Sequence, residues 1–369
     1  FGQDAYIQAR QPQSVLCAPL KKQGRLTGLV YLENNLMANA FTPDRLEVIN
    51  LLSAQAAIAL DNACLYTDVA ELNKAYARFV PRQFLQHLNK SSITEVNLGD
   101  QVQVEMSVMF ADIRAFTTLS ETLTPQANFE FINDYLACME PIIVEHGGFI
   151  DKYIGDAIMA LFSGPADDAV RAGIAMQQAL MTYNARRQRQ GQSPIRIGIG
   201  VNTGSLMLGT VGGPNRMDGT VISDAVNLSA RLEELTKTYS TAFLIGHPTY
   251  QRLRYPQHHC IRKIGQATVK GKRQLITVYE VFDGDPDSLK QGKLATLTEF
   301  QQGVEQYDSG NPHLALTHFE RCHEVAPLDP VTRYYLHRCR NPSPDREANL
   351  SGLLDPEPAS NGYPDAMLP

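Results

Sequence analysis

The sequence predicts a protein of the α+β class, in which strands and helices are interleaved without strict β-α-β repetition. Three observations support this: two short alternating apolar–polar runs near the N-terminus, several long stretches with helical spacing of apolar residues, and a series of short apolar runs separated by Gly-containing turns. The chain has 369 residues. Because single hydrophobic cores seldom exceed about 250–300 residues, we expect more than one domain.

Residues 14–33 alternate between apolar and polar types around a Gly, which predicts two antiparallel strands. A helix follows, with Thr42 as N-cap and Pro43 in its first turn. This block resembles the C-terminal end of a GAF sensor domain, and we assign it residues 1–65. Since the chain begins with Phe1, we expect it to be a fragment of a longer protein.

Residues 66–95 are expected to form a helical linker. Its apolar residues follow the 3, 4, 3 spacing of a short coiled-coil seam: Val69, Leu72, Tyr76 and Phe79. A surface helix packed on its own domain is the alternative. Pro81 interrupts the pattern, and a short connecting helix is expected after it.

Residues 96–283 carry the alternation of strands and helices that defines the fold class. We predict strands at Gln103–Phe110, Phe149–Tyr153, Ala157–Phe162, Ile195–Val201, Leu206–Val211, Ala242–Ile245, Cys260–Ile264 and Ile276–Phe282. We predict helices at Asn128–His146, Ala166–Arg189 and Ser223–Thr236. A piece from about Ile93 to Asp283 is therefore expected to fold and keep activity.

Residues 290–340 are predicted to be helical, with two antiparallel helices between Leu294 and Val325. Six residues at and near the turn resemble one tetratricopeptide unit: Gly303, Tyr307, Gly310, Ala315, Phe319 and Pro327. A single unit cannot bury both of its faces, so we expect this helical hairpin to pack on the preceding domain or to bind a protein partner. Residues 341–369 are predicted to be disordered.

Two aspartates follow apolar runs within the central block. Asp112 ends the first strand, and Asp156 lies at the turn of the predicted hairpin. Carboxylate oxygens suit Mg²⁺ or Mn²⁺, which share their coordination shell with substrate phosphates. Each aspartate alone could be an ordinary turn residue, but together they predict a metal site.

Three segments carry a family resemblance: FADIRAFT from Phe110, KYIGDAIMA from Lys152 and TVISDAVNLSARLE from Thr220. They resemble the motifs of class III nucleotidyl cyclases, in particular the adenylate cyclase catalytic domains of bacterial multidomain sensors. The resemblance implies a ferredoxin-like catalytic fold that converts ATP to 3′,5′-cyclic AMP and pyrophosphate. It also implies two Mg²⁺ or Mn²⁺ ions per site, and a homodimer whose sites are shared between two chains.

The same resemblance implies the role of each site residue. Asp112, Asp156 and the backbone carbonyl of Ile113 would hold metal. Lys152 and Thr220 would read adenine, because lysine can donate to N1 while the threonine oxygen accepts from the exocyclic amine.

Asn227 and Arg231 lie four residues apart on one helix, hence on one face. By resemblance Asn227 would orient the ribose, and Arg231 would stabilise charge at the α-phosphate. Lys270 would bind the terminal phosphates, with Lys272 as a competitor for that role, and Arg216 is a weaker candidate for phosphate contact.

Two positions depart from the family pattern. Gly219 stands where an aromatic residue commonly precedes the Thr, and Ser223 stands where Gly is common. The first departure bears on base selectivity.

Composition narrows the alternatives. The net charge of −6 gives no footprint for nucleic-acid binding, and no apolar run reaches the roughly 20 residues of a membrane span. Six dispersed cysteines favour a reduced, cytoplasmic protein. A guanylate cyclase and a catalytically silent nucleotide-binding regulator remain as alternative functions.

Overall fold

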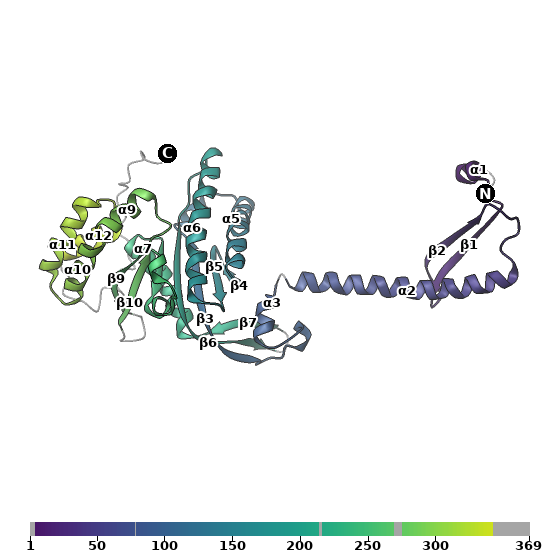
Figure 1. Cartoon of the computed structure of the whole chain (residues 1–369), viewed down its shortest axis with the longest axis horizontal. Coiled ribbons are helices and arrows are strands. Elements are labelled where there is room, and N and C mark those ends of the chain that lie inside the picture. The colour runs from purple at the N-terminus through teal and green to yellow at the C-terminus, as the bar shows by residue number, and fades with distance from the viewer. Residues whose placement is uncertain (1–3, 78, 214–215, 269–274, 342–369) are drawn as a thin grey trace. The chain divides into compact units, whose positions relative to one another are not determined.

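The structure is a computed structural model that describes residues 4–77, 79–213, 216–268 and 275–341. It forms two compact units, Phe1–Val80 and Pro81–Pro369, which are described separately (Figure 1). The predicted phosphate-binding lysines Lys270 and Lys272, and the predicted disordered tail, lie outside the described residues.

The first unit contains a short helix, a hairpin and one long helix: α1 (Ala5–Arg10), β1 (Ser14–Lys22), β2 (Arg25–Asn34) and α2 (Pro43–Tyr76). The two strands pair antiparallel, which confirms the predicted hairpin. Thr42 and Pro43 stand at the N-cap and first turn of α2, as predicted, although Thr42 makes no side-chain capping bond.

The helix α2 differs from the prediction of a separate linker helix, because it runs unbroken for 34 residues. No Gly or Pro occurs after Pro43 to interrupt it, and it ends before Phe79. Ser53 and Ala57 are its buried residues. On the opposite side, exposed apolar residues repeat with heptad spacing; we call them the α2 seam: Val48, Leu51, Ile58, Leu65, Val69, Leu72 and Tyr76.

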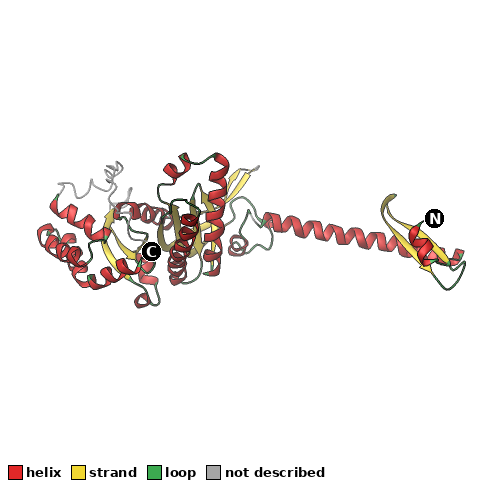
Figure 2. Cartoon of the chain, turned by 90° about the horizontal axis from the view of Figure 1, so that it is seen from above, coloured by secondary structure: helices red, strands yellow, loops and turns green. Residues whose placement is uncertain are grey.

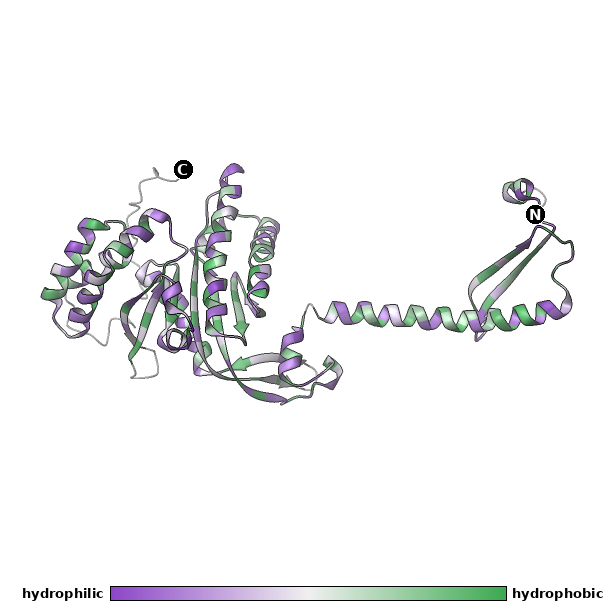
Figure 3. Ribbon diagram, viewed as in Figure 1, coloured by the Kyte–Doolittle hydropathy of each residue, from purple (hydrophilic) through white to green (hydrophobic). Residues whose placement is uncertain are grey.

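By length and composition, α2 is also the one helix of the described residues that could cross a bilayer, with a window of mean hydropathy 1.4 that is 11% buried. One such helix is weak evidence for a membrane span. Figure 3 shows polar and apolar residues alternating along it. Within the seam, the heptad positions between Val48 and Val69 are filled by the polar residues Gln55 and Asn62.

The second unit is built on an eight-stranded mixed sheet of order β4-β5-β3-β6-β8-β10-β9, with β7 also paired to β6. Its strands are β3 (Gln101–Ile113), β4 (Gly148–Ile154), β5 (Ala157–Phe162), β6 (Ile197–Gly213), β7 (Arg216–Ile222), β8 (Phe243–Gly246), β9 (Ile261–Thr268) and β10 (Leu275–Val281). The pair β6–β8 is parallel and the other pairs are antiparallel. The α+β prediction is confirmed.

The helices of this unit up to residue 252 are α3 (Arg82–His87), α4 (Phe116–Glu121), α5 (Pro125–Glu145), α6 (Ala166–Arg189), α7 (Asp224–Tyr239) and α8 (His247–Arg252). Helices α3, α5, α6 and α7 match predicted segments, whereas α8 was missed. Ser223 caps α7 by accepting a hydrogen bond from the amide of Val226 at 3.2 Å. Serine is a stronger N-cap than glycine, so this departure from the family pattern has a structural purpose.

The prediction of two strands between residues 195 and 211 was wrong, because β6 is one strand of 17 residues. The polar stretch at Asn202–Ser205 has the composition of a turn, yet it stays in the ladder with β3. The hydroxyls of Ser107 and Thr203 are 2.7 Å apart, and Thr203 also donates to Thr249. These side-chain hydrogen bonds satisfy polar groups that would otherwise destabilise a buried strand.

The sheet has an apolar core on each face. Helices α5 and α6 cover one face, and their buried residues share one core with Phe243 and Ile245 of β8. Leu244, the residue between them, points to the other face, as the alternation of a strand requires. On that face it meets α7 and the C-terminal helices (Figure 1).

Four helices follow the sheet: α9 (Asp287–Ala295), α10 (Leu297–Asp308), α11 (Pro312–Val325) and α12 (Pro330–Arg340) (Figure 2). The predicted pair around residues 308–312 is confirmed as α10 and α11. The sequence analysis included α12 in the helical segment 290–340 but did not separate it as a helix of its own, although Asp329 and Pro330 form an N-cap and first-turn signature. Its resemblance to a tetratricopeptide unit stays a prediction.

Buried charges join these helices to the sheet; we call them the buried charge cluster: Arg262, Glu280, Lys293 and Asp329. Arg262 of β9 donates to Glu280 of β10 at 2.7 Å and makes two bonds of 2.7 Å to Asp329 before α12. Lys293 of α9 donates to Glu280 at 2.7 Å. All four residues are at most 1% exposed, and Lys293 also donates to Asp285. Their charges are therefore balanced by one another and by Asp285.

Candidate active site

The two predicted metal aspartates lie together in the structure. Asp112 is the penultimate residue of β3, and Asp156 lies at the turn between β4 and β5. Strand β5 pairs directly with β3, which brings the turn beside the end of β3. The backbone amide of Ile113 donates to Asp156 at 3.2 Å, and the side chain of Ile113 is buried in the core.

The electrostatics of this pair favour a cation. Partial burial raises the pKa of Asp156 to about 7. The hydrogen bond that protonated Asp156 donates to Asp112 and the charge of Asp112 add to this rise. Among the described residues, no cluster of three or more His, Cys, Asp or Glu side chains is present. Two carboxylates without further acidic ligands suit Mg²⁺, which is commonly held by one or two carboxylates plus water and phosphate oxygens. The residues therefore fit a divalent cation that is completed by substrate.

The two predicted purine-reading residues also meet. The ammonium group of Lys152 on β4 donates a 3.1 Å hydrogen bond to the hydroxyl of Thr220 on β7. These residues are 68 positions apart in sequence, so the contact depends on the tertiary fold. A lysine donor and a hydroxyl acceptor are thus held side by side.

A bulge in β4 sets the direction of Lys152. The β4–β5 register shifts between Ile150 and Lys152, which leaves Asp151 as an extra residue. Such an insertion moves the following side chains to the other face of a sheet. The carboxylate of Asp151 lies 3.5 Å from the Lys152 ammonium, and burial raises the pKa of Asp151 despite this neighbour. The sequence analysis missed Asp151, which is recognisable only from the register.

Asn227 and Arg231 lie on α7, with Asn227 exposed and the side chain of Arg231 21% exposed. Arg231 lies 3.9 Å from the carboxylate of Glu234, one turn further along the helix. Within the described residues of one chain, no hydrogen bond or ion pair joins these two side chains to the aspartate pair or the lysine–threonine pair. The structure therefore presents the predicted catalytic residues in separate groups.

Three charged residues near the metal aspartates were missed by the sequence analysis. Lys237 of α7 lies 3.2 Å from the Asp112 carboxylate. Arg114, two residues after Asp112, forms a 3.0 Å ion pair with Glu233 of α7. These contacts connect the end of β3 to the C-terminal half of α7. Their only signal in the sequence is the i, i+4 spacing of Glu233 and Lys237.

Of the three residues predicted to contact phosphate, the structure describes one. Arg216 begins β7 and is exposed. Lys270 and Lys272 belong to the segment between β9 and β10 that lies outside the described residues, so their role stays a prediction.

Comparison with known proteins defines the class. Residues 99–281 match the adenylate and guanylate cyclase catalytic domain, and residues 1–60 match the GAF domain. The chain therefore belongs to the family of proteins that carry a class III cyclase catalytic domain, here preceded by a GAF segment.

Particular relatives are adenylate cyclases. The chain is 45% identical to an adenylate cyclase of Anabaena cylindrica over 213 residues, which is 56% of this chain and 42% of that protein. It is 37% identical to a terminal-differentiation-specific adenylate cyclase of Dictyostelium discoideum over 277 residues, 73% of this chain and 13% of that protein. The chain thus spans less than half the length of either relative.

A solved structure shares the fold. A bacterial light-regulated adenylyl cyclase superposes with a TM-score of 0.53 at 24% identity, covering 71% of this chain and 76% of that one. At this identity the likeness supports the fold assignment alone.

Proposed function

We propose that this chain is an adenylate cyclase that converts ATP to 3′,5′-cyclic AMP and pyrophosphate. The observation that carries the proposal is the 3.1 Å contact between Lys152 and Thr220. Adenine offers an acceptor at N1 beside a donor amine, which matches a lysine donor beside a hydroxyl acceptor. Guanine would direct its own N–H toward the lysine. The relatives described above, both named adenylate cyclases, support the same substrate.

The residues divide the remaining work. Asp112, Asp156 and the carbonyl of Ile113 would hold two Mg²⁺ or Mn²⁺ ions per site, which when bound lower the pKa of the ribose 3′-hydroxyl and neutralise phosphate charge. Asn227 orients the ribose. The Arg231 guanidinium stabilises the charge that develops at the α-phosphate. Lys270 binds the terminal phosphates.

We further propose that the active site is shared in a homodimer. One chain presents the aspartate pair, and its partner presents Lys152, Thr220, Asn227 and Arg231. The lack of a polar contact between α7's catalytic side chains and the aspartates within the described part of one chain supports this arrangement. A two-fold dimer would then hold two equivalent sites.

The α2 seam supplies a second surface for the same dimer. Seven apolar residues with heptad spacing are exposed there, as expected for one strand of a coiled coil. The polar seam positions Gln55 and Asn62 would pair across the two-fold axis and fix the register. We place the protein in the cytoplasm, where ATP is available. The outer surface of the C-terminal helices is left for a protein partner.

The substrate assignment is tested by mass spectrometry of the products formed from ATP and from GTP, each with Mg²⁺ and with Mn²⁺. We expect cyclic AMP and pyrophosphate, with GTP a poor substrate. Lys152→Glu with Thr220→Cys should shift the preference toward GTP. Preferential formation of cyclic GMP by the unaltered chain would contradict the proposal, and absence of either product would favour a silent nucleotide-binding regulator.

The shared site is tested by mixing two inactive variants, Asp112→Ala and Arg231→Ala. In a mixed dimer one site carries both lesions and the other carries neither. With random exchange, about a quarter of the activity should return, because half of the dimers hold one intact site of two. Mixed dimers that are detected by native mass spectrometry but remain inactive would exclude a shared site.

A further inference from the structure

Gly219 lies directly before Thr220 on β7 and has no side chain to support it. Its backbone angle is ordinary, so the reason for glycine is space. A β-carbon placed on Gly219 would lie 2.8 Å from Cζ of Phe84, closer than side-chain carbons approach one another in proteins. The volume next to Thr220 is therefore already filled by an aromatic ring from another element.

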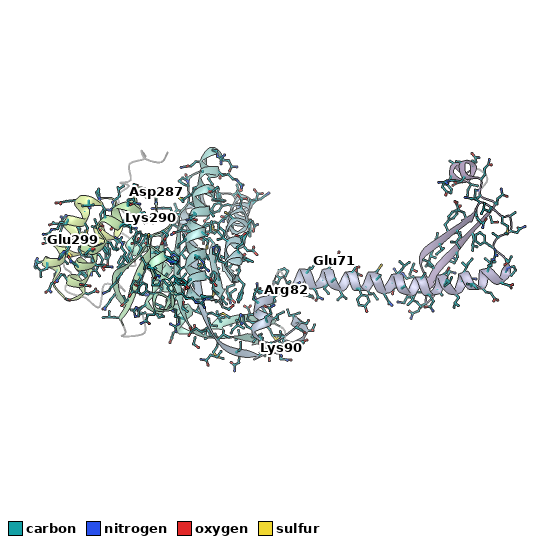
Figure 4. The ribbon with its side chains drawn as sticks, in the orientation of Figure 1. Glu71, Arg82, Lys90, Asp287, Lys290 and Glu299 are labelled. Atoms are coloured by element: carbon teal, nitrogen blue, oxygen red, sulfur yellow. The ribbon has the colours of Figure 1, made fainter. Side chains whose placement is uncertain are left out.

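That ring belongs to α3, the short helix that follows the linker in sequence. Phe84 is the buried residue of α3 and is 3% exposed. Figure 4 labels Arg82 and Lys90, which bracket this segment. Lys90 forms a 3.1 Å ion pair with Asp100, just before β3. The segment is thus docked on the catalytic sheet by an aromatic contact and by an ion pair.

The strand that carries the other purine-reading residue is contacted by the same helix. His87 stacks on Phe149 of β4, with ring centroids 6.2 Å apart. The bulge at Asp151 shifts the side-chain alternation by one, so that Phe149 and Lys152 can share a face. One turn of α3 therefore contacts both strands that carry the purine-reading pair, β7 through Phe84 and β4 through His87.

We propose that Phe84 is a positioning residue for base selection. It supplies, from α3, the aromatic support beside Thr220 that β7 lacks at Gly219. Docking of α3 then holds Lys152 and Thr220 at their hydrogen-bonding distance. The inference rests on the proposed adenylate cyclase function and adds the element on which adenine selectivity depends. Displacement of about 1 Å at a positioned group costs up to about 100-fold in rate, so small movements of α3 matter.

The test compares kcat/KM for ATP and for GTP in the full chain and in Phe84→Ala. We expect the ATP-to-GTP ratio of kcat/KM to fall about tenfold, mainly through a higher KM for ATP, because the transition-state groups on α7 are untouched. Phe84→Ala with Gly219→Phe returns a ring from β7 itself and should restore most of the ratio. Phe129→Ala, a truncation of an exposed phenylalanine on α5, is the matched control and should leave the ratio unchanged.

Gly219→Ala covers the case in which Phe84→Ala does not fold. It keeps the ring but pushes it outward, and the ratio should fall in the same direction. A ratio within twofold of the unaltered chain, in a folded Phe84→Ala or in Gly219→Ala, would overturn the inference. Failure of the unaltered chain to form cyclic AMP would instead overturn the proposed function.

Discussion

The helix that precedes the catalytic unit leaves the leucines of its seam in solvent, whereas the helices that follow the unit bury aromatic and charged side chains. Leu65 and Leu72 of α2 are each 54% exposed, while Phe300, Phe319 and the buried charge cluster are almost fully enclosed. Exposed leucines of this kind are typical of a surface that another molecule covers. The aromatic and charged side chains of the C-terminal helices are covered by the same chain. The two flanks therefore differ in kind: one exposes the apolar seam that we propose as a dimer interface, and the other is part of the catalytic fold.

The largest effect is expected from removing the C-terminal helices. A chain that ends at Asp283 keeps Arg262 and Glu280 but loses Lys293 and Asp329, and it exposes the apolar face of α7. We expect this chain to be insoluble or unfolded. A chain of residues 81–341, which lacks the α2 flank, should fold with normal secondary structure by circular dichroism. If the chain that ends at Asp283 folds, the C-terminal helices are not part of the catalytic fold. The sequence-based expectation that residues 93–283 suffice stays a prediction, and this experiment decides between the two.

The next effect isolates the charges. Arg262→Met leaves Glu280 and Asp329 buried without their main partner, and the loss should be about 3–5 kcal/mol of unfolding free energy. Arg340→Met on α12 is the control, because Arg340 is more than half exposed in its pair with Glu320 and should contribute less than about 1 kcal/mol. Urea unfolding measures both. Equal losses of unfolding free energy would mean that the buried charge cluster stabilises the fold no more than an exposed ion pair does.

Acid should weaken the C-terminal flank through Asp329. Burial alone would raise the pKa of Asp329, but the charge and hydrogen bonds of Arg262 outweigh it and lower the pKa to about 2, from 3.8. A carboxylate with a lowered folded pKa stabilises the fold above its unfolded pKa. That contribution, about 2 kcal/mol, is lost as pH falls from about 4 to about 2. Asp329→Asn should show a shallower decline of the urea midpoint over this range, and an unchanged slope would contradict the assignment.

The smallest effect on folding, though not on assembly, is expected at the other flank. Leu65→Ala with Leu72→Ala should weaken dimerisation at least tenfold by analytical ultracentrifugation, because two seam residues are truncated. The unfolding free energy of the monomer should hardly change, since both side chains are exposed there. Leu60→Ala, on the helix face near Ser53, is the control. A dimer unaffected by the double change would remove the seam from the interface.

Local patterns in the sequence and the family resemblance predict which residues form the site: Asp112 at a strand end, Asp156 at a turn, Lys152 and Thr220 at motif positions, and the Asn227–Arg231 pair on one helix. Their roles stay predictions. The structure brings the first two pairs together. What local patterns could not predict depends on partners distant in sequence. Strand β6 stays continuous because the hydroxyl of Ser107 hydrogen-bonds that of Thr203. Position 219 is glycine because the ring of Phe84 fills the space beside it.

The same limit applies to the helical segments. No local pattern predicts that α10 to α12 share one core with α7, because their apolar spacing is that of any amphipathic helix. The N-cap signature at Asp329 marked a helix start, but its carboxylate also serves Arg262 of β9. For such a residue the sequence predicts the local role, here the N-cap, but not the contact with a residue distant in sequence.

The separation between Arg262 and Asp329 has a consequence for synthesis on the ribosome. The two residues are 67 positions apart, so at about 5–20 residues per second the strand exists for about 3–13 s before its partner has been made. During that interval Arg262 lacks Asp329, so burial of its guanidinium is costly. Strands β9 and β10 are therefore not yet stabilised in the sheet. The nascent enzyme would therefore complete its catalytic unit only after α12 has emerged. A prematurely terminated product would carry every catalytic motif and still lack a finished site.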